Sequence, residues 1–275
     1  MKPGTVPLSE RWHDLDAAPD PIAFVHYLEH LSAHQWVQAY KRRTIELLEL
    51  RPGQSALDIG CGVADEVRAM AALVGPSGRA VGVDTSETML AEACRRTAPD
   101  LCARFELGDA QALPFPDATF DACRADRVLE HLVAPDRAVA ELYRVARPGA
   151  RIVLVEPDWA TLVVDHPNLD LTRRILTRRA DMPRSPWVGR QLRRLLTVAG
   201  CHDVQVWMDS LVCTAFAEAD AVLGLGVGAH RAAELGVATH AEVATWLSSL
   251  EAADEAGHFL ASLSGFFAVG IKAAP

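Results

Sequence analysis

The sequence predicts an α/β fold in which helices cover both faces of a parallel sheet. Short apolar runs alternate with amphipathic helical patterns between residues 51 and 158, and each run is bounded by its own turn signals. The composition agrees, because 275 residues that are 50% hydrophobic and 23% charged can bury one large core or two small ones. Disordered and fibrous architectures are excluded by the same composition.

The N-terminal part of the chain is predicted to be helical. Asp20 can accept hydrogen bonds from free first-turn amides, and Pro21 loses no hydrogen bond at the first helical position. The pattern continues until the turn-forming residues 51–53 end it. We therefore expect residues 1–50 to form a helical lid on a sheet domain that spans residues 51–275.

Five runs in the next hundred residues are predicted to be parallel strands. They are SALDIG (55–60), RAVGVD (79–84), ARFELG (103–108), FDACRA (120–125) and RIVLVE (151–156). Helices are expected to begin near Asp65, Ser86, Asp126 and Asp136. Ligands of such sheets bind beyond the carboxyl ends of the strands, at the point where the strand order reverses.

The sequence after residue 156 is less regular and predicts helical inserts, at about 159–187 and 215–263, that cap the sheet domain. The predicted elements are an Arg-rich helical pattern (159–184), a helix ended by glycine (188–200), a strand VQVWMDSLVCT (204–214), a helical stretch (216–263) broken at Gly224, Gly226, Gly228 and Gly236, and a last strand FFAVGIK (266–272).

Charge and cysteine usage limit the partners and the compartment. With 27 Lys and Arg against 36 Asp and Glu the net charge is −9, so the chain has no overall positive field for a nucleic-acid backbone. The six cysteines form no CxxC pair, which favours a reducing compartment. The first residues lack the apolar core of a signal peptide, and the longest uncharged apolar stretch, 259–271, is too short to span a bilayer. We expect a cytoplasmic monomer or homodimer that binds neither nucleic acid nor membrane.

The segment ALDIGCGVAD (56–65) predicts a nucleotide-type ligand at the end of the first strand. Gly60 and Gly62 let backbone amides approach a ligand closely. A dinucleotide fingerprint needs a third glycine where Asp65 stands, and this carboxylate would repel a diphosphate, so nicotinamide and flavin cofactors are disfavoured. Asp84 ends the second strand, 22 residues after Gly62, where an acidic side chain accepts hydrogen bonds from ribose hydroxyls.

Several ordered motifs over about a hundred residues carry a family resemblance. They are ALDIGCG, VGVDTSETML, GDAQALPFPDATFD, VLEHL and AVAELYRVARPGARIVLVEPD, which together cover residues 55–158. The sequence resembles the class I S-adenosylmethionine-dependent methyltransferases, most closely the subgroup of ubiquinone and menaquinone biosynthesis enzymes and many small-molecule methyltransferases. The resemblance implies a seven-stranded Rossmann-like sheet whose last strand is antiparallel, with S-adenosylmethionine as cofactor and S-adenosylhomocysteine as its product.

The resemblance also implies cofactor contacts at the ends of the strands. It places Gly60, Cys61 and Gly62 against the methionine moiety, Asp84 at the ribose, Thr85 and Met89 along the adenosine, Asp109 and Ala110 at the adenine edge, and Arg124 and Ala125 at the sulfonium. Asp58 either joins this set or only anchors the loop through backbone amides. The sequence departs from the family at Ala64, where GxGxG usually has glycine; the methyl group is either tolerated or displaces the cofactor slightly.

His131 is the candidate catalytic residue. It follows the fourth strand, where an imidazole can take a proton from an acceptor hydroxyl, although the resemblance also allows a role in the loop scaffold. Glu130, Glu156 and Asp158 lie at or just beyond strand ends, where each can orient a substrate or serve the fold.

Histidines at helical spacing form a second group of candidates. His26, His30 and His34 recur every four residues, and HYLEH matches the HxxEH pattern of zinc proteases. We interpret them as a polar stripe or pocket lining and expect no metal, because a catalytic zinc needs a third ligand and its own fold.

Aromatic and basic residues outside the motifs bear on the substrate. An apolar substrate pocket is predicted from Tyr27, Trp36, Tyr40, Trp159, Trp187 and Phe216. A basic run can meet an anionic substrate, but the favoured interpretation is a solvated helix face; it contains Arg173, Arg174, Arg178 and Arg179.

The sequence thus predicts methyl transfer from S-adenosylmethionine to a small, largely apolar molecule, with natural-product biosynthesis as one setting. Because a sulfonium methyl is already activated, most acceleration can come from holding the acceptor in line with water excluded. Two other classes stay open. One is a methyltransferase-fold cyclase that keeps the cofactor as structure and folds a polyene or polyketide; the other is a cofactor-binding regulator without activity.

Overall fold

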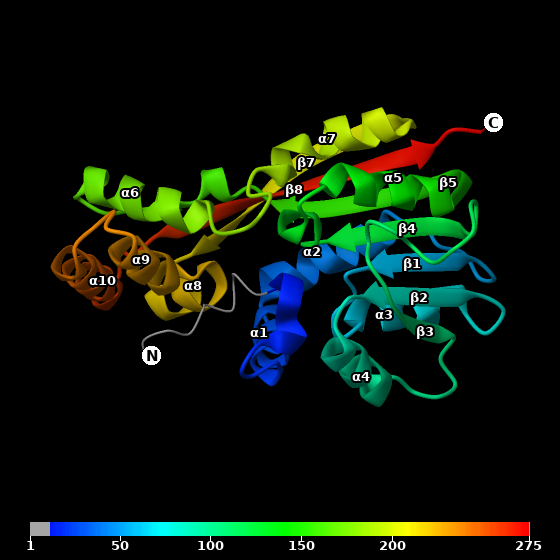
Figure 1. The fold of residues 1–275 in the computed structure, drawn as a ribbon, viewed down its shortest axis with the longest axis horizontal. Coiled ribbons are helices and arrows are strands. Elements are labelled where there is room, and N and C mark those ends of the chain that lie inside the picture. Colours follow the sequence, from blue (N-terminus) through cyan, green and yellow to red (C-terminus); the bar gives the residue numbers. More distant parts are fainter. Residues whose placement is uncertain (1–11, 275) are drawn as a thin grey trace.

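The computed structural model describes residues 12–274, which form one twisted sheet flanked by helices (Figure 1). The strand order is β3-β2-β1-β4-β5-β8-β6, and β7 pairs with the other edge of β8. The strands are β1 (Ser55–Ile59), β2 (Arg79–Asp84), β3 (Ala103–Leu107), β4 (Phe120–Asp126), β5 (Ala146–Pro157), β6 (Val163–Val164), β7 (Cys201–Cys213) and β8 (Ala261–Lys272).

The directions of the strands confirm the mostly parallel sheet. β1 to β5 pair in parallel, whereas β8 runs antiparallel to β5, β6 and β7. The predicted count of seven strands is one too low. The additional strand β6 is only two residues long and pairs Val163 and Val164 with Ser262 and Ala261, a match too short to leave a periodic signal in the sequence.

Helices cover both faces of the sheet. One face carries α5 (Pro135–Val145) and α7 (Val188–Ala199), which pack with the strands into the largest apolar cluster. The other face carries α3 (Asp65–Val74) and α4 (Glu87–Arg96). This two-sided covering explains why the parallel strands are almost continuously apolar.

Helix boundaries follow local capping chemistry. The Ser86 hydroxyl accepts from the Met89 backbone N–H at 3.1 Å and begins α4, and Gly200 ends α7 in the left-handed region at φ 104°. The prediction of a helix that begins near Asp126 is wrong. Only the short 3₁₀ helix η3 (Leu129–His131) forms there before Pro135 begins α5.

A helical cap with its own apolar core lies beside one end of the sheet (Figure 1). Its helices are α6 (Leu169–Ala180), α8 (Phe216–Leu223), α9 (Leu225–Glu234) and α10 (His240–Glu255), and the 3₁₀ helix η4 (Trp159–Thr161) leads into it. Gly224 and Gly236 end helices as predicted. Gly226 and Gly228 lie inside α9 instead, and the helical stretch ends at Glu255 rather than 263.

The predicted lid is two helices, α1 (Ile22–Ser32) and α2 (Gln35–Glu46), preceded by the 3₁₀ helix η2 (Trp12–Ala17). Its first eleven residues lie outside the described part of the chain. His34 falls between α1 and α2, where its Nδ1 accepts from the Trp36 backbone N–H and its Nε2 lies 2.5 Å from Glu218. His26, His30 and His34 therefore do not share one helix face.

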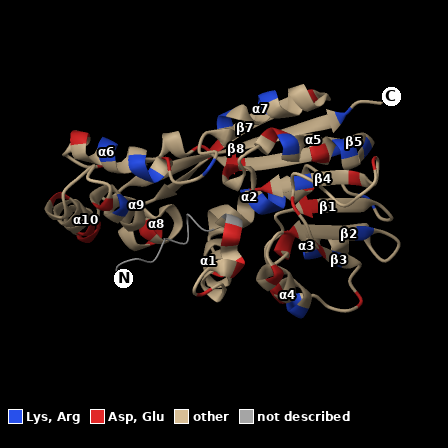
Figure 2. Cartoon of the chain, in the orientation of Figure 1, with Lys and Arg blue, Asp and Glu red and all other residues tan. Residues whose placement is uncertain are grey.

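Charges of both signs are interspersed along the elements (Figure 2). Within residues 12–274 no group of three or more His, Cys, Asp and Glu side chains is arranged to hold a metal ion. No helix in that range is both long and apolar enough to cross a membrane.

Candidate functional site

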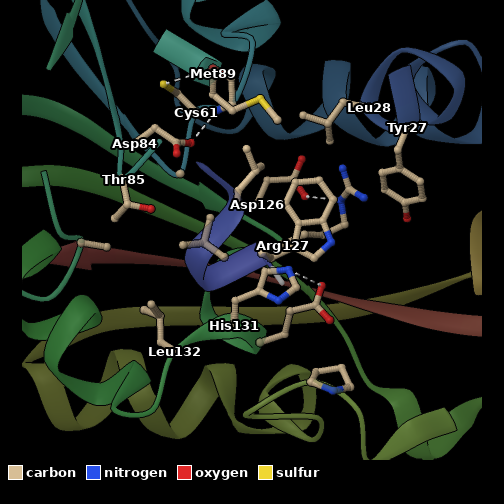
Figure 3. A pocket seen from close by; sticks show the side chains of 18 of the residues that line it. Tyr27, Leu28, Cys61, Asp84, Thr85, Met89, Asp126, Arg127, His131 and Leu132 are labelled. Atoms are coloured by element: carbon tan, nitrogen blue, oxygen red, sulfur yellow. Dashed lines mark hydrogen bonds and ion pairs between the residues drawn. The ribbon is translucent and has the colours of Figure 1, made fainter. Parts of the chain in front are cut away.

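A cavity of about 590 Å³ lies beyond the carboxyl ends of β1, β2 and β4. The sheet's order reverses between β1 and β4, so the loops after these strands diverge and leave room for a ligand. Helices η2, α1 and α6 close the cavity with Trp12, Tyr27, Leu28 and Arg179. In Figure 3, Asp84 and Thr85 lie on one side of the cavity and Tyr27 lies on the other.

The loop after β1 borders the cavity in a left-handed conformation. Gly60, Gly62 and Ala64 have φ angles of 63°, 51° and 64°. A Cβ at Gly60 would lie 2.3 Å from Cγ2 of Val128, so this glycine is required by a close approach of the loop after β4. The usual glycine at position 64 has a similar conformational reason, and Ala64 accepts the strain of a left-handed residue while fully buried.

Asp84 connects the end of β2 to this loop. Its Oδ2 accepts from the Gly62 backbone N–H at 2.8 Å, and its Oδ1 accepts from the Ser86 backbone N–H at 3.0 Å. Burial raises the pKa of Asp84, although these backbone hydrogen bonds act in the opposite direction. Each carboxylate oxygen keeps acceptor capacity for a hydroxyl donor from a ligand.

Ten of the eleven candidate cofactor residues line this cavity: nine that the resemblance assigned, and Asp58, whose role the sequence left open. They are Asp58, Gly60, Cys61, Gly62, Asp84, Thr85, Met89, Asp109, Ala110 and Arg124. Ala125 is the exception, because its side chain is fully buried in the core of the sheet. Asp109 Oδ1 also accepts from the Gln111 backbone N–H at 2.8 Å, which fixes the turn after β3.

A buried ion-pair network borders the cavity at the carboxyl ends of β1 and β4. The Arg124 guanidinium donates to Asp58 at 2.9 Å and to Asp126 at 2.7 Å, and its Nε lies 3.3 Å from the Thr44 hydroxyl. Burial raises the pKa of Asp58 to about 6, while Arg124 lowers it. The partner of Asp58 is thus an arginine side chain rather than the backbone amides expected from the sequence. Arg124 borders the cavity, and its ion pairs were not predicted from the sequence.

A second ion pair joins the lid to α3. The Lys41 ammonium lies 2.9 Å from the Glu66 carboxylate, and both line the cavity. Burial opposes ionisation of Glu66, but Lys41 and Arg124 outweigh it and lower the pKa of Glu66. This pair was not predicted from the sequence, in which the acidic residue directly after Asp65 was the available signal.

The loop after β4 carries His131 to the cavity. Glu156 holds this loop, because its carboxylate accepts from the backbone N–H groups of Val128 at 2.9 Å and Leu129 at 2.6 Å. His131 stacks on Trp12, with ring centroids 5.8 Å apart. Glu156 therefore supports the fold. Of Glu130, Glu156 and Asp158, the three acidic candidates at or beyond the ends of β4 and β5, only Glu130 lines the cavity.

Glu130 is held by an aromatic side chain and Asp158 by an arginine. The Glu130 carboxylate accepts from Trp159 Nε1 at 2.5 Å. Asp158, which is fully buried, pairs with Arg190 on α7 at 2.6 Å and does not border the cavity. Asp158 thus has a structural role.

Two of the six aromatic residues predicted to line a pocket border the cavity. Tyr27 and Trp159 line the cavity, whereas Trp36, Tyr40, Trp187 and Phe216 do not. Trp36 and Tyr40 pack together at 4.9 Å and reach β8, because α2 turns this face toward the sheet. Phe216 packs on Phe259 in the cap, and Trp187 is 52% exposed.

The basic run of α6 is not a uniform solvated face. Arg173 is exposed, and Arg174 pairs at the surface with Asp170 at 3.1 Å. Arg179 is only 4% exposed and lines the cavity. The expectation of a solvated face is therefore wrong for Arg179, because the cap helices fold over this end of α6.

Fold and site together define a Rossmann-like protein with its ligand cavity at the carboxyl ends of the strands. The family model described as a methyltransferase domain matches residues 57–154. An uncharacterized 37.1 kDa protein in transposon TN4556 of Streptomyces fradiae is 38% identical over 92% of this chain and 72% of its own length. A demethylmenaquinone methyltransferase of Symbiobacterium thermophilum is 38% identical over 46% of this chain, which spans about half (51%) of that enzyme.

Solved structures share the fold. The YcgJ protein of Bacillus subtilis superposes with a TM-score of 0.59 at 20% identity, covering 86% of this chain and all of YcgJ. The [4+2]-cyclase SpnF superposes with a TM-score of 0.53 at 23% identity, covering 88% of this chain and 84% of SpnF. Residues 57–154 therefore belong to a methyltransferase domain, and the chain as a whole has the fold of these solved structures.

Proposed function

We propose that this protein transfers a methyl group from S-adenosylmethionine to a small molecule with an apolar body. The observation that carries the proposal is the shared cavity. One side presents Asp84 and the left-handed loop around Gly62, and the opposite side presents His131, Tyr27 and Trp159 from the loop after β4, the lid and the cap. This arrangement supports the proposal because two ligands bound at these two sides would lie against each other in one cavity.

The residues present fit the cofactor. Asp84 offers free lone pairs for ribose hydroxyls, and Asp109 offers an acceptor at the end of β3 for an amine. Within residues 12–274 no Lys or Arg pairs with Asp84, which is bound by backbone N–H groups, so its carboxylate can complement a positively charged ligand. When bound, S-adenosylmethionine supplies a methyl group on a positively charged sulfur.

The chain's own contribution is enclosure and orientation. Trp12, Leu15 and Leu28 cover the cavity from the lid, so bulk water is kept from the reacting groups. Holding an acceptor in line supplies up to roughly 7 to 11 kcal/mol of the barrier. His131, stacked on Trp12, can take a proton from an acceptor hydroxyl where the chemistry needs it.

The test has two stages. Calorimetric titration of the purified protein should show binding of both S-adenosylmethionine and S-adenosylhomocysteine. A screen with a labelled methyl donor, against cell extracts and quinone and polyketide panels, should then yield a product heavier by one methyl group. Binding of NAD but of neither S-adenosyl ligand would overturn the proposal.

The same screen also tests the alternative that the protein is a cyclase. A product of unchanged mass, formed only with cofactor present, would indicate a cyclase instead. Similarity to SpnF concerns the fold, and nothing in the cavity favours cyclisation over methyl transfer. The net charge of −9 continues to argue for a small-molecule partner over nucleic acid.

A further inference from the structure

The cap side of the cavity contains a buried arginine without a counter-ion. Arg179, in the last turn of α6, is 4% exposed, and no carboxylate of residues 12–274 lies within ion-pair distance of it. Its Nη1 is buried without any hydrogen-bond partner in that range. Burying a charge is costly unless the charge is paired, so such a group is typical of a site completed by a ligand.

Arg179 is held in one orientation. Its Nε donates to the Leu223 carbonyl at 2.6 Å, and its guanidinium lies over the Trp159 ring at 3.8 Å from the ring centroid. These contacts occupy Nε and one face of the guanidinium. They leave Nη1 without a hydrogen-bond partner within residues 12–274, in a residue that lines the cavity.

Two glycines, Gly224 and Gly228, make room for the Arg179 side chain. A Cβ at Gly228 would lie 2.5 Å from Cβ of Arg179, and one at Gly224 would lie 3.2 Å from its Nε. Gly228 lies inside α9, where glycine costs about 1 kcal/mol relative to alanine. The two glycines therefore serve the close approach of α9 to Arg179.

A second guanidinium reaches the same part of the cavity. Arg127, just after β4, adopts a left-handed conformation at φ 55°, and its Nε is buried without a hydrogen-bond partner. The nearest carboxylate is that of Asp126, 3.7 Å away and already paired with Arg124. Figure 3 shows Arg127 in the middle of the cavity lining.

The positive charges of Arg127 and Arg179 both act on the Tyr27 hydroxyl. Burial raises the pKa of Tyr27, while Arg127 and Arg179 lower it. The opposing charge is Glu130, which attracts Arg179 but is bound to Trp159 Nε1. Asp220, the other carboxylate near α9, accepts from the Gly226 backbone N–H at 2.6 Å. Hydrogen bonds thus engage both carboxylates, whereas Nη1 of Arg179 and Nε of Arg127 have no hydrogen-bond partner within residues 12–274.

We propose that Arg179, with Arg127, binds an oxygen-centred anion of the methyl acceptor, such as a carboxylate or an ionised hydroxyl. Guanidinium groups match such anions in geometry and charge. Trp159, Val222 and Val227 line the same region and suit an apolar or aromatic body attached to that anion. This inference rests on the proposed function. It predicts that the methyl acceptor is amphipathic, with an anionic oxygen group on an apolar body, rather than largely apolar.

Four small probes test the inference on protein loaded with S-adenosylhomocysteine and on unloaded protein. Calorimetry compares 2-naphthoate with 2-naphthamide, and 2-naphthol with 2-methoxynaphthalene. The anionic or acidic member of at least one pair should bind about tenfold more tightly than its neutral partner. Preference within the first pair identifies a carboxylate as the recognised group, and preference within the second identifies a hydroxyl.

Substitutions of Arg179 test whether this residue causes the preference for the anionic or acidic probe. Arg179→Met should abolish it, Arg179→Lys should retain part of it, and Arg173→Met, an exposed control on the same helix, should leave it unchanged. S-adenosylhomocysteine affinity and the melting curve report whether each variant is folded, and Arg179→Gln replaces the Met variant if that one unfolds. A preference that persists in folded Arg179 variants would overturn the inference, as would the same affinity within both pairs or no binding of any probe. Wild-type protein that fails to bind S-adenosylhomocysteine contradicts the proposed function instead.

Discussion

The Asp84 carboxylate accepts a hydrogen bond from the backbone N–H of Gly62 at 2.8 Å. This bond joins the end of β2 to the loop after β1, so the two elements that border the cofactor end of the cavity are fixed relative to each other. The Asp84 side chain is therefore oriented before any ligand arrives, which lowers the entropic cost of binding.

Asp84→Ala should weaken binding of S-adenosylmethionine by about 10-fold to 1000-fold, because charge-assisted hydrogen bonds to ribose hydroxyls are lost. S-adenosylhomocysteine should lose a similar factor, since the ribose is common to both ligands. Calorimetric titration measures both affinities, and a melting curve of each protein is the control for folding. Unchanged affinity in a folded variant would show that Asp84 does not hold the ribose.

Affinity for S-adenosylhomocysteine should fall as the pH is lowered from neutral. Burial raises the pKa of Asp84, so its carboxylate takes up a proton at a higher pH than an exposed aspartate and then loses acceptor capacity. Titrations at several pH values, with Asp84→Asn as the matched variant, measure this. A wild-type profile that the Asn variant reproduces would assign the pH dependence to another group, such as Asp58, whose pKa burial raises to about 6.

His131→Ala should reduce turnover less than about 100-fold, because proximity rather than proton removal is proposed as the main contribution. Steady-state kinetics on the acceptor identified by the methyl screen gives the value. His202→Ala, at an exposed position on β7, is the control. A larger loss with unchanged cofactor affinity would identify His131 as a general base.

The lid should become ordered when cofactor and acceptor bind, and α1 should change more than α2. Tyr27 and Leu28 on α1 line the cavity, while α2 is already tied to α3 by the Lys41 to Glu66 ion pair. Hydrogen exchange with and without ligands compares residues 22–32 with residues 35–46. Equal protection of α1 in both states would contradict a moving lid.

Ala64→Gly should change the free energy of unfolding by no more than about 1 kcal/mol, because relief of left-handed strain offsets the lost methyl packing and the greater freedom of glycine when unfolded. S-adenosylmethionine affinity should stay within about threefold of wild type. Denaturant unfolding and calorimetry measure the two quantities. A large gain in affinity would show that the alanine displaces the cofactor.

The glycines of the cap show where prediction from sequence was incomplete. Gly224 and Gly236 end helices, as their residue type suggested, but Gly228 lies inside α9. Its position is explained by Arg179, whose Cβ would lie 2.5 Å from a Cβ at Gly228. Sequence pattern alone cannot distinguish a glycine that ends a helix from one that lets a neighbour approach.

The sequence by itself determined the five parallel strands and placed Asp84 at the end of β2 and Gly62 in the loop after β1, because periodicity, capping and turn chemistry act over a few residues. Only the tertiary structure decided that Arg124 pairs with Asp58, 66 residues away, and that Arg179 is buried in the cavity. Helical periodicity shows which residues share a face. Which element covers that face depends on packing between segments far apart in the chain, and burial, charge pairing and access to the cavity follow from it.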